Sequence, residues 1–311
     1  MSKGACSRER GGLSLGGNRA AWLSGERGAV TATSPTLRQR ELGKSLRQLR
    51  HDLGWTVEDV GEKLLCSATK ISRIETGQRR PSLRDVRDLC RLYNVTEAET
   101  AELMELARMA REPGWWRQYS DLNLDPYIGL EQVASSITCF SSYYVPALLQ
   151  TEAYAREIIK AIARKIEPGI HEQRVEVRLR RQQRLDQDDR PRYRAILDEA
   201  VLRRRVGGPA VMADQLDKIL KLEREGKATA QVIPFEVGAH AAQDGNFVLL
   251  EFQESSPVVF VEGLTTNLYL ERDSDLDRYR EAMEYLRDEA LSPRDSVALI
   301  AEAQKSYAGG K

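Results

Sequence analysis

The sequence predicts a protein of two domains, a small all-α domain followed by a larger α+β domain. Three observations support this prediction. The chain has 311 residues, which is more than a single hydrophobic core usually supports. Closely spaced helix patterns fill residues 35–112, whereas β-branched segments alternate with helix patterns over residues 113–308. A Pro-Gly pair at positions 113–114 interrupts the periodicity between the two parts.

Five helices are expected in the first domain. The first covers Thr36–Asp52, has leucines at helical spacing and stops at Gly54. Each of the others follows a Ser or Thr that can cap a helix, in three cases with an acidic residue three positions later. Their expected extents are Thr56 to Leu64, Ser67 to Thr76, Ser82 to about Tyr93 and Thr96 to about Glu112.

Charge is distributed unevenly along a chain whose formal net charge is zero. Residues 36–95 contain 13 basic and 8 acidic side chains, a net charge of +5, and residues 1–35 carry +3. The remainder of the chain therefore carries −8. A basic module on an acidic body indicates that only the first module meets a polyanion.

The composition argues against several classes of protein. The four cysteines are widely spaced and the three histidines lie far apart, so no metal motif and no cofactor are expected. Cys66 and Cys90 lie in apolar helical patterns and are expected to be buried thiols, which suits a reducing cytoplasm. No apolar run approaches the roughly 20 residues of a membrane span, and no signal peptide is present. A cytoplasmic protein without a membrane partner is expected.

Residues 56–82 carry the strongest motif, a candidate helix-turn-helix. Two short helices that cross closely need a small residue at their contact, and Gly61 is placed for it although glycine costs about 1 kcal/mol in a helix. The apolar residues shared by the two helices are Val60, Leu64, Ile71 and Ile74.

That arrangement leaves one polar face of the second helix free to enter the major groove of DNA. Ser67 and the helix N-terminus are expected to hold a phosphate, and Thr69 and Lys70 to reach base edges. The complete set of expected DNA-binding residues is Thr56, Ser67, Ala68, Thr69, Lys70, Ser72, Arg73, Arg79 and Arg80. Arg79 and Arg80 would grip the phosphate backbone. Further backbone contacts are expected from Arg38, Arg40, Lys44, Arg47 and Arg50.

The stretch resembles the Cro/cI-type (XRE), lambda-repressor-like helix-turn-helix. The shared pattern is S-x-x-x-I-S-R-I-E-x-G followed by a basic loop and proline, here Ser67 to Pro81. Leu65 stands where that family usually has a turn glycine, which implies a costly left-handed leucine or an altered turn. Val57 stands where many members have a phosphate-contacting Gln, so the resemblance implies one contact fewer. A plain protein-interaction module is the alternative, and the basic loop favours DNA.

The region before this motif, residues 1–34, is rich in Gly, Ser and Arg and lacks periodicity, which predicts a disordered tail. A passive tail or an upstream start site is favoured over a basic arm that touches DNA. After the first domain, Trp115 and Trp116 follow the Pro-Gly break. Packing anchors are favoured there over an aromatic recognition site.

The second domain is expected to have a mostly antiparallel sheet. Helices are expected over Tyr127–Ser142, Thr151–Ala163, His171–Leu185, Met212–Glu225, Leu276–Ala290 and Pro293–Tyr307. Strands are expected over Arg192–Leu197, Ala230–Pro234, Phe247–Phe252, Val258–Glu262 and Asn267–Leu270.

Several segments of this domain, including Val145 to Ala155 and Leu197 to Arg203, look like the C-terminal domain of actinobacterial WhiJ-like regulators, also described as toxin–antitoxin-like. The resemblance implies a small acidic or neutral partner protein encoded nearby, with a role in development or secondary metabolism. Ala147 departs from the glycine that many members carry.

An enzymatic second domain is the weaker alternative. Asp198, Glu199 and His240 are the candidate groups, but no nucleophile elbow, metal spacing or phosphate loop accompanies them, and a surface ion-pair cluster with Arg203–Arg205 is simpler. The loop Gly238–Gly245 is either an ordinary connection, which is favoured, or a ligand rim. The arginines of His171–Leu185 are interpreted as a solvated face, with docking of an acidic partner or an anionic ligand as the alternative.

The sequence therefore indicates a non-enzymatic, sequence-specific DNA-binding transcription regulator, interpreted as a repressor. A homodimer is expected to bind a double-stranded operator whose half-sites lie about 10–10.5 bp, or a multiple, apart. The C-terminal domain would respond to a small partner protein or a ligand. The alternative is an antitoxin-like module that sequesters a small protein, with DNA binding serving autoregulation.

Overall fold

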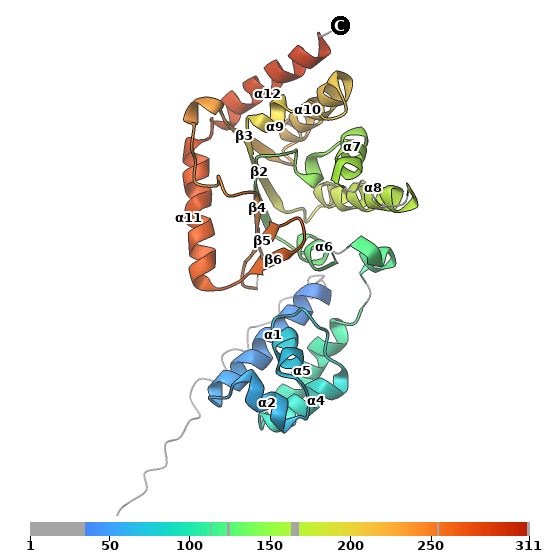
Figure 1. Cartoon of the computed structure of the whole chain (residues 1–311), viewed down its shortest axis with the longest axis vertical. Coiled ribbons are helices and arrows are strands. Elements are labelled where there is room, and N and C mark those ends of the chain that lie inside the picture. The colour runs from blue at the N-terminus through green and yellow to red at the C-terminus, as the bar shows by residue number, and fades with distance from the viewer. Residues whose placement is uncertain (1–34, 113, 123–124, 163–167, 254, 310–311) are drawn as a thin grey trace, which may run out of the picture.

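The structure, a computed structural model, describes residues 35–112, 114–122, 125–162, 168–253 and 255–309. Figure 1 shows a helical N-terminal body beside a second body built around a sheet. The predicted combination of an all-α domain and an α+β domain is confirmed. The predicted disordered tail, residues 1–34, lies outside the described residues.

Five helices form the N-terminal domain, as predicted. They are α1 (Pro35–Asp52), α2 (Val57–Lys63), α3 (Ala68–Glu75), α4 (Leu83–Leu92) and α5 (Glu97–Met109). The side chains of Thr56, Ser82 and Thr96 form capping boxes at the starts of α2, α4 and α5, and Ser67 caps α3. These caps satisfy backbone N–H groups that the first helical turn leaves without partners. Helix α5 ends three residues before the expected Glu112.

One apolar core holds these five helices together. Its members come from every helix, so no helix of this domain packs alone. The fully buried side chains include Leu42, Leu46, Val60, Ile71, Ile74 and Val86. Cys90 is buried as expected, whereas Cys66 is only half-buried, and both are free thiols.

The C-terminal domain contains a six-stranded mixed sheet. Its strands are β1 (Ser136–Ser141), β2 (Arg192–Asp198), β3 (Thr229–Ile233), β4 (Phe247–Glu251), β5 (Val258–Glu262) and β6 (Asn267–Leu270). The spatial order is β3-β2-β1-β4-β5-β6. The pairs β1–β2 and β2–β3 are parallel and the other three pairs are antiparallel. Three of the five pairs are antiparallel, in line with the expected mostly antiparallel sheet, but β1, β2 and β3 are parallel to one another, so the sheet is mixed.

Strand β1 is the main error of the sequence prediction, which placed a helix over Tyr127–Ser142. The helix α6 (Asp125–Glu131) ends early, and residues 136–141 form a strand at the centre of the sheet. A central strand is buried on both faces and therefore lacks the alternation of apolar and polar residues that identifies an exposed strand. A short apolar run of this kind cannot be distinguished from a buried helix by periodicity.

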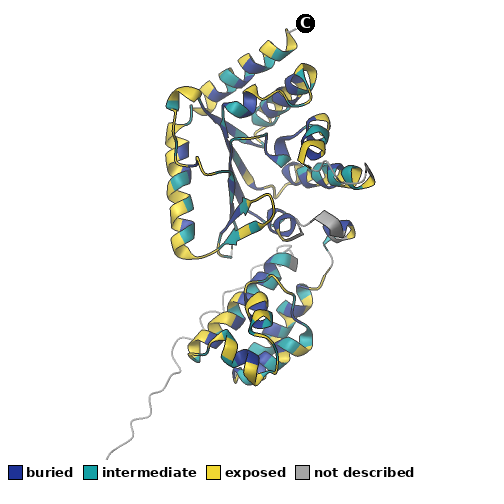
Figure 2. Cartoon of the chain, viewed as in Figure 1, coloured by how far each residue is buried: buried dark blue, intermediate teal, exposed yellow. Residues whose placement is uncertain are grey.

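Helices cover both faces of the sheet (Figure 1). On one side of the sheet lie α6, α7 (Glu152–Ile162), α8 (Pro168–Gln182), α10 (Pro209–Arg224) and α12 (Pro293–Ala308). Helix α8 packs there mainly against α7. The other face packs against α11 (Asp273–Glu289). Short helical segments lie at Trp115–Leu122, Ala147–Leu149, Gln183–Asp186, Ala200–Arg203 and Phe235–Val237. Figure 2 shows the burial that follows, with dark strands between helices that are exposed only on their outer sides.

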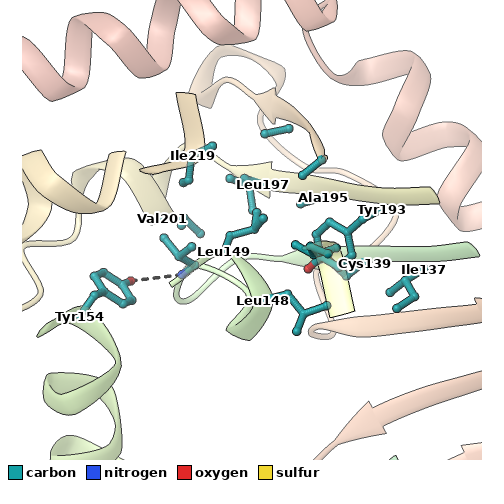
Figure 3. Close-up of a cluster of buried hydrophobic side chains, with 14 of the residues drawn as sticks. Ile137, Cys139, Leu148, Leu149, Tyr154, Tyr193, Ala195, Leu197, Val201 and Ile219 are labelled. Atoms are coloured by element: carbon teal, nitrogen blue, oxygen red, sulfur yellow. Dashed lines mark hydrogen bonds between the residues drawn. The ribbon is translucent and has the colours of Figure 1, made fainter. Parts of the chain in front are cut away.

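The larger core lies on the five-helix side of the sheet, and Figure 3 shows part of it. Strands β1 and β2 contribute alternate residues such as Ile137, Cys139 and Tyr193. The buried Tyr154 hydroxyl accepts a hydrogen bond from the backbone N–H of Val145 at 3.1 Å, which ties α7 to the segment after β1.

The paired tryptophans are packing anchors, as favoured from the sequence. Trp116 is buried in a small cluster with Tyr119, Ile128 and Val177. Trp115 packs edge-on against Trp116, and the guanidinium of Arg180 lies 4.3 Å from a Trp115 ring centroid. The junction between the domains is therefore fixed onto α6 and α8.

Helix α1 also contacts the C-terminal domain directly. The side chain of Leu37 is buried in the larger core of that domain. Arg40 forms an ion pair with Glu271 and lies 5.2 Å from the ring centroid of Tyr269 on β6. Ser255 donates a hydrogen bond to Glu41 at 2.6 Å. One helix thus belongs to both domains.

Among the helices of the described ranges, none is both long and apolar enough to cross a bilayer.

Candidate nucleic-acid interface

Helices α2 and α3 pack closely because Gly61 has no side chain. A Cβ at position 61 would lie 2.8 Å from the carbonyl oxygen of Cys66 and 3.1 Å from the amide nitrogen of Ala68. The predicted role of Gly61 is confirmed. Gly43 of α1, which sequence reasoning missed, has the same role toward α3, because its Cβ would lie 2.7 Å from the carbonyl oxygen of Ile74. A glycine inside a helix pattern is the signal that could have identified it.

The turn between α2 and α3 contains a leucine in the left-handed conformation, one of the two outcomes expected for Leu65. Leu65 has a φ of 52°, the left-handed conformation that favours glycine, and its side chain is 94 % exposed. Leucine therefore pays a steric cost here without gaining burial. Val57, the second departure noted from the sequence, packs against the helical core.

Helix α3 is held against α1 by a buried ion pair. The guanidinium of Arg50 donates two hydrogen bonds to the Glu75 carboxylate, each 2.8 Å long, and a third to the carbonyl oxygen of Trp55 at 2.6 Å. Both side chains are buried. Arg50 was expected to contact the DNA backbone, and so was Arg40. Both expectations are wrong, because the two side chains are buried and paired inside the protein.

The outer face of α3 presents polar side chains to solvent. Thr69, Ser72 and Arg73 are exposed, and Ala68 is half-buried at the first turn. Their inward neighbours Ile71 and Ile74 are in the core, so the exposed set lies on one side of the helix.

Lys70, a member of the expected site, forms an ion pair with Asp85. Its ammonium nitrogen donates to the Asp85 carboxylate at 2.6 Å, and Asp85 also accepts from the backbone N–H of Ser82 at 2.8 Å. Burial alone would raise the pKa of Asp85, but the hydrogen bonds from Lys70 and Ser82 outweigh it and lower that pKa. Lys70 therefore lies over the start of α4.

The hydroxyls of Ser67 and Thr56 are used by the helix caps. Ser67 accepts from the backbone N–H of Lys70 at 3.2 Å, and Thr56 accepts from that of Asp59 at 3.1 Å. Both residues are exposed at the starts of their helices. Each start presents N–H groups and the positive end of a helix dipole, which favour a phosphate.

The basic loop after α3 is held against α1. Arg80 donates to the side-chain oxygen of Gln39 at 3.3 Å, and Gln39 donates to the carbonyl oxygen of Gly77 at 2.7 Å. Arg79 is exposed, and its backbone N–H donates to the carbonyl oxygen of Arg73 at 2.8 Å. Gln39 was missed from the sequence, since a polar residue in a helix gives no signal of such a contact.

Asp198, Glu199 and His240 are brought together, although not as a surface cluster. Glu199 is buried, accepts from the backbone N–H of Phe235 at 3.1 Å and pairs with Arg203 at 2.8 Å. The buried His240 ring lies 3.5 Å from the Asp198 carboxylate. These contacts hold the loop after β3 onto the end of β2. Within the loop 238–245 the His240 ring and Ala242 are buried, and most of the other residues are exposed.

An exposed polar helix face, a tight glycine contact and a basic loop define a helix-turn-helix domain, and residues 41–103 are similar to the family described as helix-turn-helix domain. That domain indicates DNA-binding regulation and fits a non-enzymatic regulator. Residues 124–302, more than half of the chain, match the family described as domain of unknown function (DUF5753), and the chain belongs to that family. No curated protein and no solved structure matches the chain.

Proposed function

We propose that this protein is a sequence-specific transcription regulator of the Cro/cI type, a cytoplasmic homodimer that represses by binding a two-fold operator. The observation that carries the proposal is the solvent-facing side of α3, where Thr69, Ser72 and Arg73 project together. The buried Arg50–Glu75 pair and the close contacts at Gly43 and Gly61 hold that helix in one orientation. A rigid helix with a polar outer face is what direct recognition of base edges requires.

The division of labour among the site residues follows from their environments. Thr69, Ser72, Arg73 and, after release from Asp85, Lys70 contact bases. Ser67 and Thr56 offer helix starts to phosphates, with Ala68 at the first turn of α3. Arg79 and Arg80 contact the phosphate backbone from a loop whose position Gln39 fixes.

The experiment is selection from a random double-stranded DNA library with the full-length protein, followed by competition binding. We expect enrichment of one motif with half-sites about 10–10.5 bp, or a multiple, apart. Arg73→Ala should weaken the selected site, while Arg224→Ala, which removes an equal charge from the exposed surface of α10, should leave it unchanged. Failure to enrich any motif, or equal effects of the two variants, would refute sequence-specific binding through α3. Sedimentation tests the dimer, and a reporter with the motif at its promoter tests repression.

The C-terminal domain is proposed to respond to a ligand or to a small partner protein. The direct contacts of Leu37 and Arg40 with that domain support a regulatory connection, since they attach the first helix of the DNA-binding domain to it. An antitoxin-like protein that sequesters a small partner is the alternative. Purification of the tagged protein from its own cells would favour that alternative if a stoichiometric small protein accompanies it.

A further inference from the structure

A cavity of about 100 Å³ lies on the five-helix side of the sheet, between α6, β1, the segment after β1 and α8. Aromatic rings form much of its wall. The rings of Tyr127 and Phe260 are tilted by 39° to each other with centroids 4.3 Å apart, and Tyr193 of β2 also lines the cavity. This volume is smaller than the roughly 150 Å³ of an apolar cavity that holds benzene, so a six-membered ring enters only if side chains that line the cavity move.

Two arginines and two glutamates line the cavity, and Arg178 is the one of these arginines that forms no ion pair with a described residue. Arg181 donates two hydrogen bonds of 2.7 Å to Glu131, so these two buried charges neutralise each other. Glu262 accepts from the Tyr144 hydroxyl at 3.3 Å. Arg178 donates at 2.8 Å to the neutral side chain of Gln150, and within the described ranges no carboxylate lies within ion-pair distance of it.

Arg178 keeps its charge in this setting. Burial, followed by repulsion from Arg181, lowers the pKa of Arg178 to about 10, which still leaves the guanidinium protonated at neutral pH. Glu262 attracts Arg178 only from beyond ion-pair distance, and a half-buried cation without an ion pair is unfavourable unless something else compensates it. The interpretation of the arginines of His171–Leu185 as a solvated face is also wrong for Arg181 and Arg184, whose side chains are buried.

Asn246 supplies a second polar side chain to the cavity lining. Its side-chain oxygen accepts from the backbone N–H of Ser142 at 2.8 Å and from the Ser142 hydroxyl at 3.0 Å. This contact leaves the amide NH₂ group of Asn246 to donate elsewhere. The wall therefore combines two sets of N–H donors with aromatic surface.

We propose that this cavity is a binding site for a small aromatic carboxylate, with the ring against Tyr127 and Phe260 and the carboxylate bound by Arg178. A planar guanidinium matches a carboxylate through two parallel hydrogen bonds. Binding of the carboxylate does not depend on the proposed function. An effect of the carboxylate on DNA affinity rests on the proposed function as a DNA-binding regulator.

The cavity wall is continuous with the contact to the DNA-binding domain. Phe260 pairs across strands with Tyr269, with ring centroids 5.2 Å apart, and Arg40 of α1 lies 5.2 Å from the Tyr269 ring centroid. Arg40 also packs at Gly77, where a Cβ would lie 3.0 Å from its Cγ, next to the end of recognition helix α3. An occupant that displaces Phe260 would therefore move Tyr269, and through Tyr269 it would move Arg40 of α1, the helix that packs against α3.

The binding test uses the full chain without DNA and benzoate as the probe. Ligand-observed NMR and thermal shift should show saturable binding of benzoate, and binding at least tenfold weaker for benzamide, which has the same shape without the charge. Arg178→Gln should weaken benzoate tenfold or more and Arg178→Lys less, while Arg224→Gln on exposed α10 is the matched control. Unchanged melting of the unliganded variants establishes that they are folded.

Three results would overturn the site: no saturable benzoate binding, equal binding of benzamide, or benzoate binding retained by Arg178→Gln. The regulatory role is tested separately with the selected DNA motif. Benzoate at saturation should change the DNA affinity of the wild type at least threefold and leave that of Arg178→Gln unchanged. Benzoate binding without any change in DNA affinity would overturn the regulatory role, and absence of DNA binding altogether would be a failure of the proposed function instead.

Discussion

The ammonium of Lys70 lies 2.6 Å from the carboxylate of Asp85, so the expected base-contacting lysine of α3 is held by the first turn of α4. Both side chains are about a quarter exposed, at 26 % and 22 %. Lys70 must leave Asp85, or share it, before it can reach a base edge. Under the proposed function, Asp85 would therefore compete with DNA for Lys70.

Replacement of this competitor should strengthen DNA binding. Asp85→Asn removes a negative charge beside α3 and releases Lys70, for which we expect a two- to fivefold gain in affinity, about the 0.5–1 kcal/mol of a surface pair. Fluorescence anisotropy with the selected motif measures it. Asp88→Asn on the same helix, next to Arg84 instead of Lys70, is the control. An equal gain for both variants would assign the effect to general charge.

The Lys70–Asp85 pair makes the free energy of unfolding depend on pH in the acid range. The pKa of Asp85 is lowered in the folded protein, so its contribution is complete above the unfolded-state pKa of about 3.9 and is lost as pH falls through the lower, folded-state pKa. Urea denaturation of the wild type and of Asp85→Asn should therefore differ most near neutral pH and converge in acid. A stability difference that persists below both pKa values would contradict this linkage.

Base recognition and phosphate binding should be separable by mutation. Lys70→Ala is expected to weaken the specific site by about 1–3 kcal/mol, with little effect on unrelated DNA. Arg80→Ala should weaken all DNA alike and reduce the slope of log affinity against log salt by about 0.9. A gel-shift series at several salt concentrations distinguishes the two. If neither substitution alters DNA binding, the recognition face has been placed wrongly.

The buried pair between α1 and α3 should be costly to break. Glu75→Gln leaves the Arg50 guanidinium buried without its counter-ion, and we expect a loss of about 3–5 kcal/mol in the free energy of unfolding. Glu58→Gln, at an exposed position of α2, is the control and should change stability little. The double variant Arg50→Met with Glu75→Leu should recover much of the loss, and a double variant as unstable as Glu75→Gln would argue against uncompensated charge as the cause.

The left-handed turn residue offers a stabilising substitution. Leu65→Gly relieves the steric cost of a φ of 52° and removes an exposed apolar side chain, so we expect a gain of about 1 kcal/mol. Asn94→Gly at a φ of 54° should gain less, because asparagine tolerates this conformation. Equal or negative effects at position 65, measured by urea denaturation, would indicate that the turn carries no such strain.

Local signals explain why the N-terminal domain was predictable. Caps such as Thr56 and Ser82 start helices through contacts within four residues, and Gly61 reports a backbone contact by having no side chain. The roles of Arg50 and Arg178 were not predictable, because an arginine looks the same in sequence whether it meets solvent, Glu75 or a cavity. The strand Ser136–Ser141 was missed because its partners lie more than 50 residues away, at positions 192–197 and 247–251.

The burial of Leu37 in the core of the C-terminal domain limits where the chain can be cut into fragments. A fragment that ends at residue 112 would expose Leu37 and Arg40 to water, and a fragment that starts at residue 113 would lack Leu37 in its larger core and Arg40 over Tyr269. Transplanting the DNA-binding domain onto another partner domain at the linker would fail for the same reason. A workable chimera would retain residues 35–41 in the form that its new C-terminal half recognises, because the graft point lies within a helix and not between domains.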